Sequence, residues 1–264
     1  KEAGIREAVC TMWQDDGAET PMGAGLSSIV RFAEHGFAKE VSEEALKEQF
    51  EFLTGTSWEA CEILGEFDRP QGSAFYDNPS KYLLYQDVLI GLFDEQIRNW
   101  DVKSYYEGLR DRLLKALEEG MKRNCTQKNC MQILQRGGGY AEEVLSLYVC
   151  LADALSVKAP LGRKLYGAYE KKDRQALAAL AEKEIPLAME KIRVYRDRRE
   201  ALWNRESRIF GFEVLDIRIG GLLARLESAK KRVESWLNGE VDSLPELEEP
   251  RLPFRPVKEG EEHT

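Results

Sequence analysis

The sequence predicts a mainly α-helical protein that begins with one β/α unit. Residues 9–13, VCTMW, form a short apolar run typical of a strand, and a helical pattern follows them. Beyond this unit, apolar residues recur at steps of three and four along most of the chain, as they do in amphipathic helices. The sequence shows no internal repeat, so a solenoid is disfavoured. We therefore expect a small αβ piece followed by a helical bundle.

The β/α unit is predicted because an apolar strand is followed by a proline that can open a helix. An apolar strand of this kind is usually buried in a parallel sheet, with functional residues at its carboxyl end and a helix behind it. Pro21 can open that helix, which we expect to end near Gly36. The apolar face of the helix is formed by Leu26, Ile29, Val30 and Ala33.

The next helix is expected between Ser42 and Gly55. Ser42 is a good amino-terminal cap, Glu43 and Glu44 suit the positive end of the helix, and Gly55 is a typical stop signal. Residues 56–67 then predict a further short helix.

Helices dominate the rest of the chain after a break at residues 68–80, which contain two prolines and a glycine. Pro186 should kink or restart one long helix. Residues 209–221 are rich in β-branched side chains, so a strand or an irregular turn competes with a helix there. The acidic tail after Gly239 is expected to be extended and partly disordered. Helical periodicity covers 102–120, 140–155, 174–208 and 222–236.

Composition argues against several classes of partner. A formal net charge of -9 gives no reason to bind nucleic acid or an anionic membrane, because phosphate binding needs clustered Lys and Arg. We find no apolar run long enough for a membrane span, and residues 1–9 lack the apolar core of a signal peptide. Five cysteines at unrelated spacings favour a reducing compartment, so we expect a cytoplasmic protein.

Cysteine and histidine positions predict no metal and no other cofactor. Cys125 and Cys130 form the only local cysteine cluster, and ordinary thiols in a helix linker explain it. Only His35, beside a helix end, and His263, in the polar tail, could complete a ligand set.

Trp13, Asp15, Asp16 and Glu19 follow the predicted strand and are the candidate site. An indole can stack on a sugar ring and a carboxylate can accept bonds from two hydroxyls, so Trp-x-Asp suits a sugar pocket. A core tryptophan followed by a solvated acidic loop explains the same residues. Asp15 and Asp16 would point in opposite directions on an extended strand, which makes them a poor acid–base pair.

Three separated stretches together resemble the C-terminal third of bacterial exo-β-N-acetylhexosaminidases, members of glycoside hydrolase family 20. The likeness extends from about residue 8 to the last helix. In that family a (β/α)8 barrel carries the active site, and in this branch an α-helical domain follows the barrel. The stretches are TMWQDDGAETP at 11–21, DNPSKYLLYQDVLIGLFD at 77–94 and FGFEVLDIRIGGL at 210–222.

The resemblance implies a division of the chain and a mechanism. Residues 1–37 look like the eighth strand and helix of the barrel, residues 38–240 like the helical domain, and residues 241–264 like an extended acidic tail. Family members use a Glu to protonate the leaving oxygen and an Asp to orient the acetamido group that acts as the internal nucleophile. No residue here matches that pair, so the resemblance implies no catalytic residue in this chain and no activity of the chain alone.

Two residues match the strand-eight motif of the family. The resemblance implies that Trp13 walls the pocket and that Asp15 binds hydroxyls of the terminal N-acetylhexosamine. Many family members have Glu at the second position, so Asp15 is a shorter arm and its hydroxyl partner is open. Asp16 and Glu19 match no position with a known role.

A stand-alone helical interaction or dimerisation module is the alternative hypothesis. Trp13 would then be buried in the core of the module. Long amphipathic helices and an acidic tail favour it, because such helices often pack across a two-fold axis. The two hypotheses are compatible, since the helical domain of an enzyme can form a homodimer contact.

Overall fold

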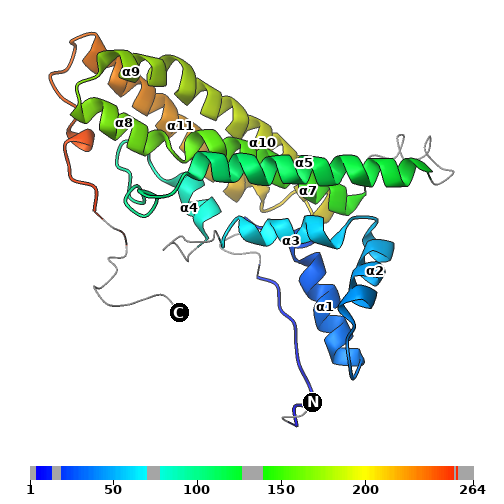
Figure 1. The fold of residues 1–264 in the computed structure, drawn as a ribbon. Helices are drawn as coiled ribbons and strands as arrows, with labels where there is room; N and C mark the ends of the chain where they lie inside the picture. The colour runs from blue at the N-terminus through cyan, green and yellow to red at the C-terminus, as the bar shows by residue number, and fades with distance from the viewer. Residues whose placement is uncertain (1–3, 14–18, 70–77, 127–138, 253, 255–264) are drawn as a thin grey trace.

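A computed structural model describes residues 4–13, 19–69, 78–126, 139–252 and 254, and most of these residues lie in helices (Figure 1). The prediction of a mainly helical protein is confirmed. The α-helices are α1 Leu26–Phe37, α2 Glu43–Thr54, α3 Trp58–Glu66, α4 Pro79–Tyr85, α5 Val102–Thr126, α7 Tyr140–Lys158, α8 Leu161–Glu170, α9 Arg174–Ala179, α10 Ile185–Glu206 and α11 Phe212–Leu237. Short helical turns are η1 Met22–Gly25, η2 Leu180–Glu184 and η3 Pro245–Leu247.

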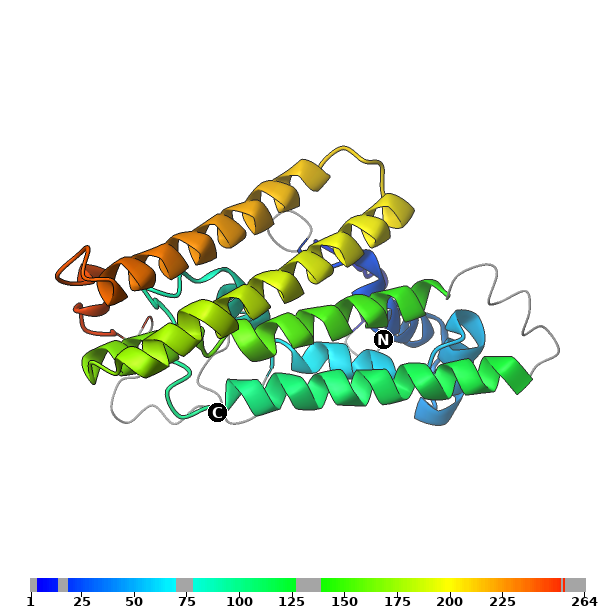
Figure 2. The same ribbon diagram turned by 90° about the horizontal axis from the view of Figure 1, so that it is seen from above.

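Four long helices lie side by side in the order α5, α7, α10 and α11 (Figure 2). Helix α7 packs between α5 and α10, and its Ala152, Ala154 and Leu155 are fully buried. Among the described residues, the stretch Tyr140–Glu170 is long and apolar enough to cross a membrane, contrary to the prediction that no run in the sequence is. Its most apolar window is 67% buried within the fold, and a buried core helix passes the same test.

The strand expected at residues 9–13 does not form. Residues 4–13 have no regular structure, and no strand occurs anywhere in the described part of the chain. A strand requires a neighbour that accepts and donates ladder hydrogen bonds. Without such a neighbour, an apolar run does not form a β-strand, even though its composition favours one.

In the stretch 209–221, for which strand, turn and helix competed, residues 209–211 form a turn and residues 212–221 begin helix α11. Gly211 adopts a φ of 102°, a left-handed conformation that suits glycine, and Phe212 begins the helix. Trp203, Phe212 and Leu215 form a small buried cluster across the α10–α11 turn. The indole of Trp203 donates to the carbonyl of Arg208 at 2.7 Å, which closes the turn. Packing across this turn therefore overrides the β-branched composition.

The break expected at Pro186 is present. Helix α9 passes through the π-helical turn η2 into α10, and Pro186 lies in the first turn of α10. Proline lacks the N–H that would bond to the preceding turn, so the wider turn accommodates it.

The tail after Gly239 is more ordered than expected. The turn η3 forms at Pro245–Leu247, and Leu244 and Leu247 are buried in the main core. Arg251 lies against the turns that follow α4, where its guanidinium donates to the carbonyl of Leu89 at 2.6 Å. Apolar side chains within the acidic sequence therefore anchor residues 244–251. Residues 253 and 255–264 lie outside the described part.

Helices α1, α2 and α3 form a wing at one end of the bundle (Figure 1). Leu46, Phe50, Trp58 and Cys61 make a cluster separate from the main core. The expected caps of α2 are confirmed: Ser42 Oγ accepts from the Ala45 N–H at 3.3 Å, and Gly55 has a φ of 69°.

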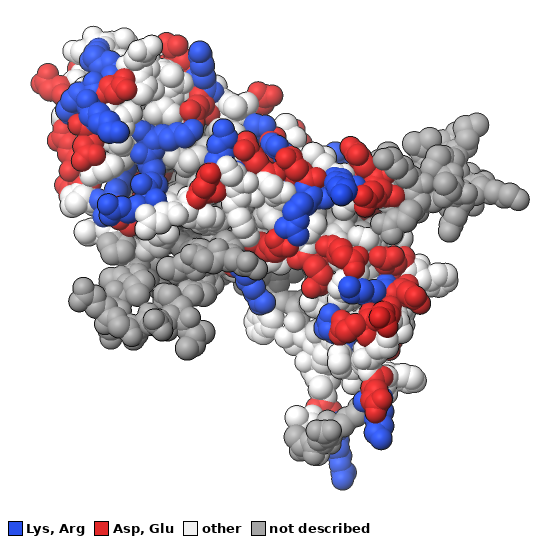
Figure 3. Space-filling model, viewed as in Figure 1, with Lys and Arg blue, Asp and Glu red and all other residues white. Residues whose placement is uncertain are grey.

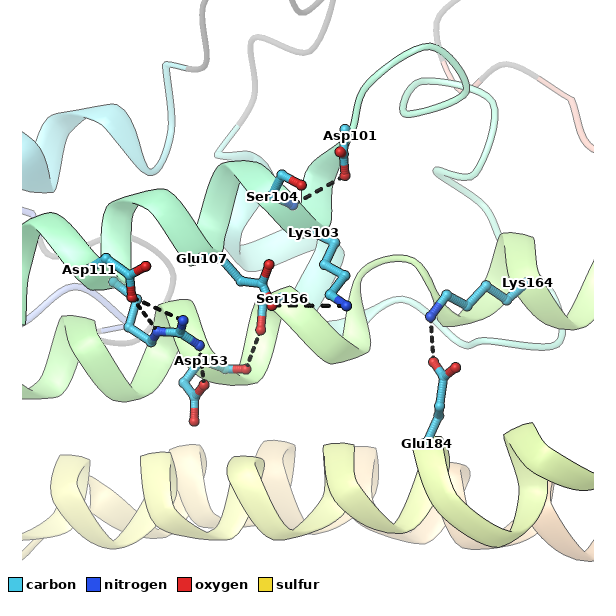
Figure 4. Close-up of polar contacts among 10 residues, drawn as sticks. Asp101, Lys103, Ser104, Glu107, Asp111, Asp153, Ser156, Lys164 and Glu184 are labelled. Carbon is cyan, nitrogen blue, oxygen red and sulfur yellow. Dashed lines mark hydrogen bonds and ion pairs between the residues drawn. The ribbon is translucent and has the colours of Figure 1, made fainter.

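Charged side chains of both signs cover the face in Figure 3, with Lys and Arg gathered near α8 and α9 and Asp and Glu near α2 and α3. Some of them link helices. Asp153 on α7 accepts from Arg110 of α5 at 3.1 Å, and Lys164 of α8 pairs with Glu184 of η2 at 2.5 Å (Figure 4). An exposed pair such as Lys164–Glu184 contributes little stability individually.

Candidate functional site

Trp13, the first candidate residue, is a surface residue. Its side chain is 85% exposed, and its Nε1 donates to Thr11 Oγ1 at 3.1 Å within the same segment. The expectation that it is a core residue of a stand-alone module is therefore wrong. The second candidate, Asp15, and its neighbour Asp16 lie outside the described residues.

A hollow lies beside Trp13, between the amino-terminal segment and the helices. Asp68 and Tyr148 stand on its helical side. Both carboxylate oxygens of Asp68 can accept hydrogen bonds from hydroxyls. Its Oδ1 accepts from the Ser80 N–H at 3.1 Å and from the Ser80 Oγ at 2.6 Å. An exposed indole next to a carboxylate and a phenol can hold a ring with one apolar face and several hydroxyls.

Glu19 connects the same segment to two distant helices. One carboxylate oxygen accepts from Arg218 of α11 at 2.9 Å, and the other accepts from the Tyr85 hydroxyl of α4 at 3.2 Å. The Glu19 side chain is only 9% exposed. Burial and the nearby Glu19 carboxylate raise the pKa of Tyr85 well above its usual value, so its hydroxyl remains a donor.

A second contact holds the segment four residues further on. The Gly23 N–H lies 3.5 Å from Oε1 of Glu206, which also accepts from the Tyr140 hydroxyl at 2.5 Å. The Arg199 guanidinium lies 3.7 Å from the other oxygen of Glu206, and both side chains are buried. A Cβ on Gly23 would stand 2.4 Å from Val144 Cγ2, so only glycine permits this approach.

Two further strongly perturbed titratable groups lie elsewhere, in a buried network. Burial raises the pKa of Asp94 to about 6 and lowers the pKa of Lys158 to about 7. The attraction between the two charges acts in the opposite direction on each pKa but is the weaker effect. Lys158 donates to the carbonyls of Leu83 and Gln86 at 2.8 and 2.5 Å. Asp94 and Lys158 are 1% and 0% exposed, which keeps them from a substrate and gives them a structural role.

No cluster that could bind a metal occurs among the described residues. His35 lies in the last turn of α1, and the side chains of Cys125, Cys130 and His263 are outside the described part. Cys10, Cys61 and Cys150 are free thiols, and burial raises the pKa of Cys61 to about 12, which makes that thiol unreactive.

Comparison with known families gives the geometry its context. The Glycoside Hydrolase 20C C-terminal domain matches residues 61–264, more than three quarters of the chain. The chain belongs to this family. No curated protein matches the sequence.

As a 20C C-terminal domain, the chain represents the C-terminal part of a glycoside hydrolase, and the substrate of the parent enzyme is a glycan. The match begins within α3 and includes α4, α5 and α7–α11. Trp13 and Glu19 precede the matched residues. Glu19 is held by Tyr85 and Arg218, and both of these partners lie within the 20C C-terminal domain.

Sequence reasoning found the residue type suited to sugar binding but missed what holds it. Glu19 was given no role, and Tyr85 and Arg218 were not singled out. Their only signal was that each lies in one of the three stretches that carried the family resemblance. Gly23 and Glu206 gave no signal, because close approach of backbone to a buried carboxylate depends on tertiary structure.

Proposed function

We propose that this chain is the C-terminal part of a bacterial exo-acting β-N-acetylhexosaminidase. Residues 1–37 are then the last β/α unit of its barrel, which residues 38–240 follow as the helical domain. The family match supports this proposal, as does the 85% exposed indole of Trp13 beside a polar hollow. Together with a cytoplasmic location, which the free thiols support, this is the function that accounts for most observations.

The proposed chemistry is substrate-assisted hydrolysis with retention at the anomeric carbon. The substrate's own acetamido group attacks that carbon while an acid outside this chain protonates the leaving oxygen. Trp13 stacks on the terminal sugar and Asp15 binds its hydroxyls. Since this chain supplies binding groups and no residue that matches the catalytic Asp–Glu pair, it is inactive alone.

The test is hydrolysis of an aryl β-N-acetylglucosaminide by the chain extended upstream in its own gene. We expect activity in the extended protein only, with the 264-residue chain as control. Trp13→Ala should lower kcat/KM by at least about 10-fold because it removes a large stacking surface, whereas Trp13→Phe keeps an aromatic face and should lose less. Inert extended protein, or comparable activity in the short chain, contradicts the proposal.

We also propose that the helical domain forms a homodimer contact. Phe210, in the turn before α11, is 81% exposed, and Val214 and Ile217, in the first turns of α11, are 41% and 73% exposed. Three exposed apolar side chains within eight residues are typical of a surface that another chain covers. A second copy of this chain is the partner we propose.

A further inference from the structure

The three stretches that resemble family 20 meet at one carboxylate. Glu19 comes from the first stretch, Tyr85 from the second and Arg218 from the third. The partners are 66 and 199 positions from Glu19 along the chain, so no local pattern brings them together. We call these three residues the Glu19 tether.

The burial of the Glu19 carboxylate distinguishes the tether from an ordinary surface ion pair. The Glu19 side chain is 9% exposed and that of Arg218 is 38% exposed, and both oxygens of Glu19 accept a hydrogen bond. Removing a partner of a buried carboxylate is unfavourable, because the remaining charge loses part of its compensation. Glu19 therefore holds its segment more firmly than the exposed pairs hold the bundle surface.

A second fixed point lies nearby, at Gly23. Its backbone N–H faces the buried Glu206 carboxylate, and Val144 leaves no space for a side chain. Helices α4 and α11 thus hold the segment at Glu19, and α7 and α10 hold it at Gly23. A segment fixed at two points four residues apart has little freedom to move against the bundle.

We propose that Glu19 is a positioning residue that fixes the chain after Trp13 against the helical domain. The tether restrains the chain six positions from the indole, and this is a role of the helical domain in the enzyme. The proposal rests on the proposed function, because it assigns sugar binding to Trp13 and Asp15. Glu19 itself does not touch the substrate.

A purely structural role for the tether predicts a different result. If Glu19 only stabilises the fold, its loss lowers the melting temperature and the amount of folded enzyme, and leaves the KM of the folded enzyme unchanged. If it positions the sugar-binding residues, its loss changes KM more than kcat, because those residues bind the sugar without transferring the proton.

The first experiment measures kcat and KM of the upstream-extended enzyme on an aryl β-N-acetylglucosaminide. We expect Glu19→Gln and Arg218→Met each to raise KM about 10-fold and to change kcat less than about 3-fold, since small displacements of binding groups are costly. The double variant should be no worse than the worse single variant, because both remove one interaction.

Arg225→Met is the matched control. Arg225 lies on the same helix as Arg218 and pairs with Asp87 at 2.7 Å, but this pair does not involve the amino-terminal segment. Its loss should leave KM unchanged. A rise in KM equal to that of Arg218→Met would show a general effect of charge on α11 and overturn the proposal.

The second experiment measures hydrogen exchange on the 264-residue chain and needs no activity. Glu19→Gln should speed exchange of the amides in residues 19–25 by about 10-fold and leave α11 unchanged. An active wild-type enzyme whose KM does not move in Glu19→Gln overturns the positioning role, whatever the exchange shows. If the extended wild type is inert, the proposed function is refuted. If hydrogen exchange in residues 19–25 is the same in Glu19→Gln and in the wild type, the tether is refuted independently of that function.

Discussion

Asp94, Lys158 and Arg251 illustrate how a few buried charges are accommodated in a helical core. Arg251 Nε lies 3.4 Å from Asp94 Oδ2, and the two side chains are 6% and 1% exposed. The contact joins the tail to the turn after α4. Burial destabilises the charged form of Asp94 more than the neighbouring cations stabilise it, and so its pKa rises to about 6.

This raised pKa predicts a specific dependence of stability on pH. The unfolded chain releases the Asp94 proton near pH 3.8 and the folded chain retains it until about pH 6. Stability from this group is therefore full below pH 3.8 and is lost as pH rises to 6. Between pH 4 and 6 the wild type should lose about 2 kcal/mol relative to Asp94→Asn.

Urea unfolding of both proteins at several pH values measures this difference. Asp197→Asn, which removes an exposed carboxylate, controls for a change of one charge. Parallel curves for wild type and Asp94→Asn from pH 4 to 6 would show that Asp94 titrates normally. Lys158 acts in another window, since its lowered pKa of about 7 makes stability fall as pH falls from 10.5 toward 7.

At the scale of elements, helices were predictable and their tertiary contacts were not. Ser42 and Gly55 act through the backbone within one turn, so the sequence alone located α2. The strand at residues 9–13 failed because a strand depends on a partner outside its own sequence. The turn before α11 depends on Trp203 packing against Phe212, which a periodicity argument does not contain.

The wing of α1, α2 and α3 leads to a prediction about its independence. Phe50 is 0% exposed and packs edge-on against Trp58, with ring centroids 5.2 Å apart, in a cluster separate from the main core. Phe50→Ala should therefore destabilise the wing by about 3 to 5 kcal/mol. Hydrogen exchange should become faster in α1 and α2 and stay unchanged in α7 and α10.

Phe52→Ala is the control for this prediction, because Phe52 lies on the same helix and is 88% exposed. It should change stability by less than about 0.5 kcal/mol. Uniformly faster exchange across all helices of Phe50→Ala would mean that the wing and the bundle unfold as one unit.

At the scale of the whole molecule, the proposed homodimer can be tested by light scattering. Wild-type chain should have twice the mass of the Phe210→Ser/Ile217→Ser double variant, because the substitutions remove exposed apolar area from the contact. Ile90→Ser changes a residue that is 57% exposed outside α11 and should leave the mass unchanged. A monomeric wild type, or a dimer insensitive to the double variant, would refute this contact.

The sequence located the bundle but only part of the site. Trp13 was identified from the chemistry of its side chain, which a single residue reveals. Glu19, Tyr85 and Arg218 act through a meeting of distant residues, and the tail around Leu247 docks through a few apolar positions within an acidic run. Both features depend on how the chain closes on itself, which local patterns do not encode.

The length of chain between Glu19 and Arg218 has a consequence for biosynthesis. A ribosome that adds about 5 to 20 residues per second needs about 10 to 40 s to make the 199 positions that separate them. During that interval the segment after Trp13 has been made, but helix α11, which supplies one of the contacts of Glu19, does not yet exist. Full positioning of that segment therefore follows the synthesis of α11, so a nascent chain acquires it only after Arg218 has emerged from the ribosome.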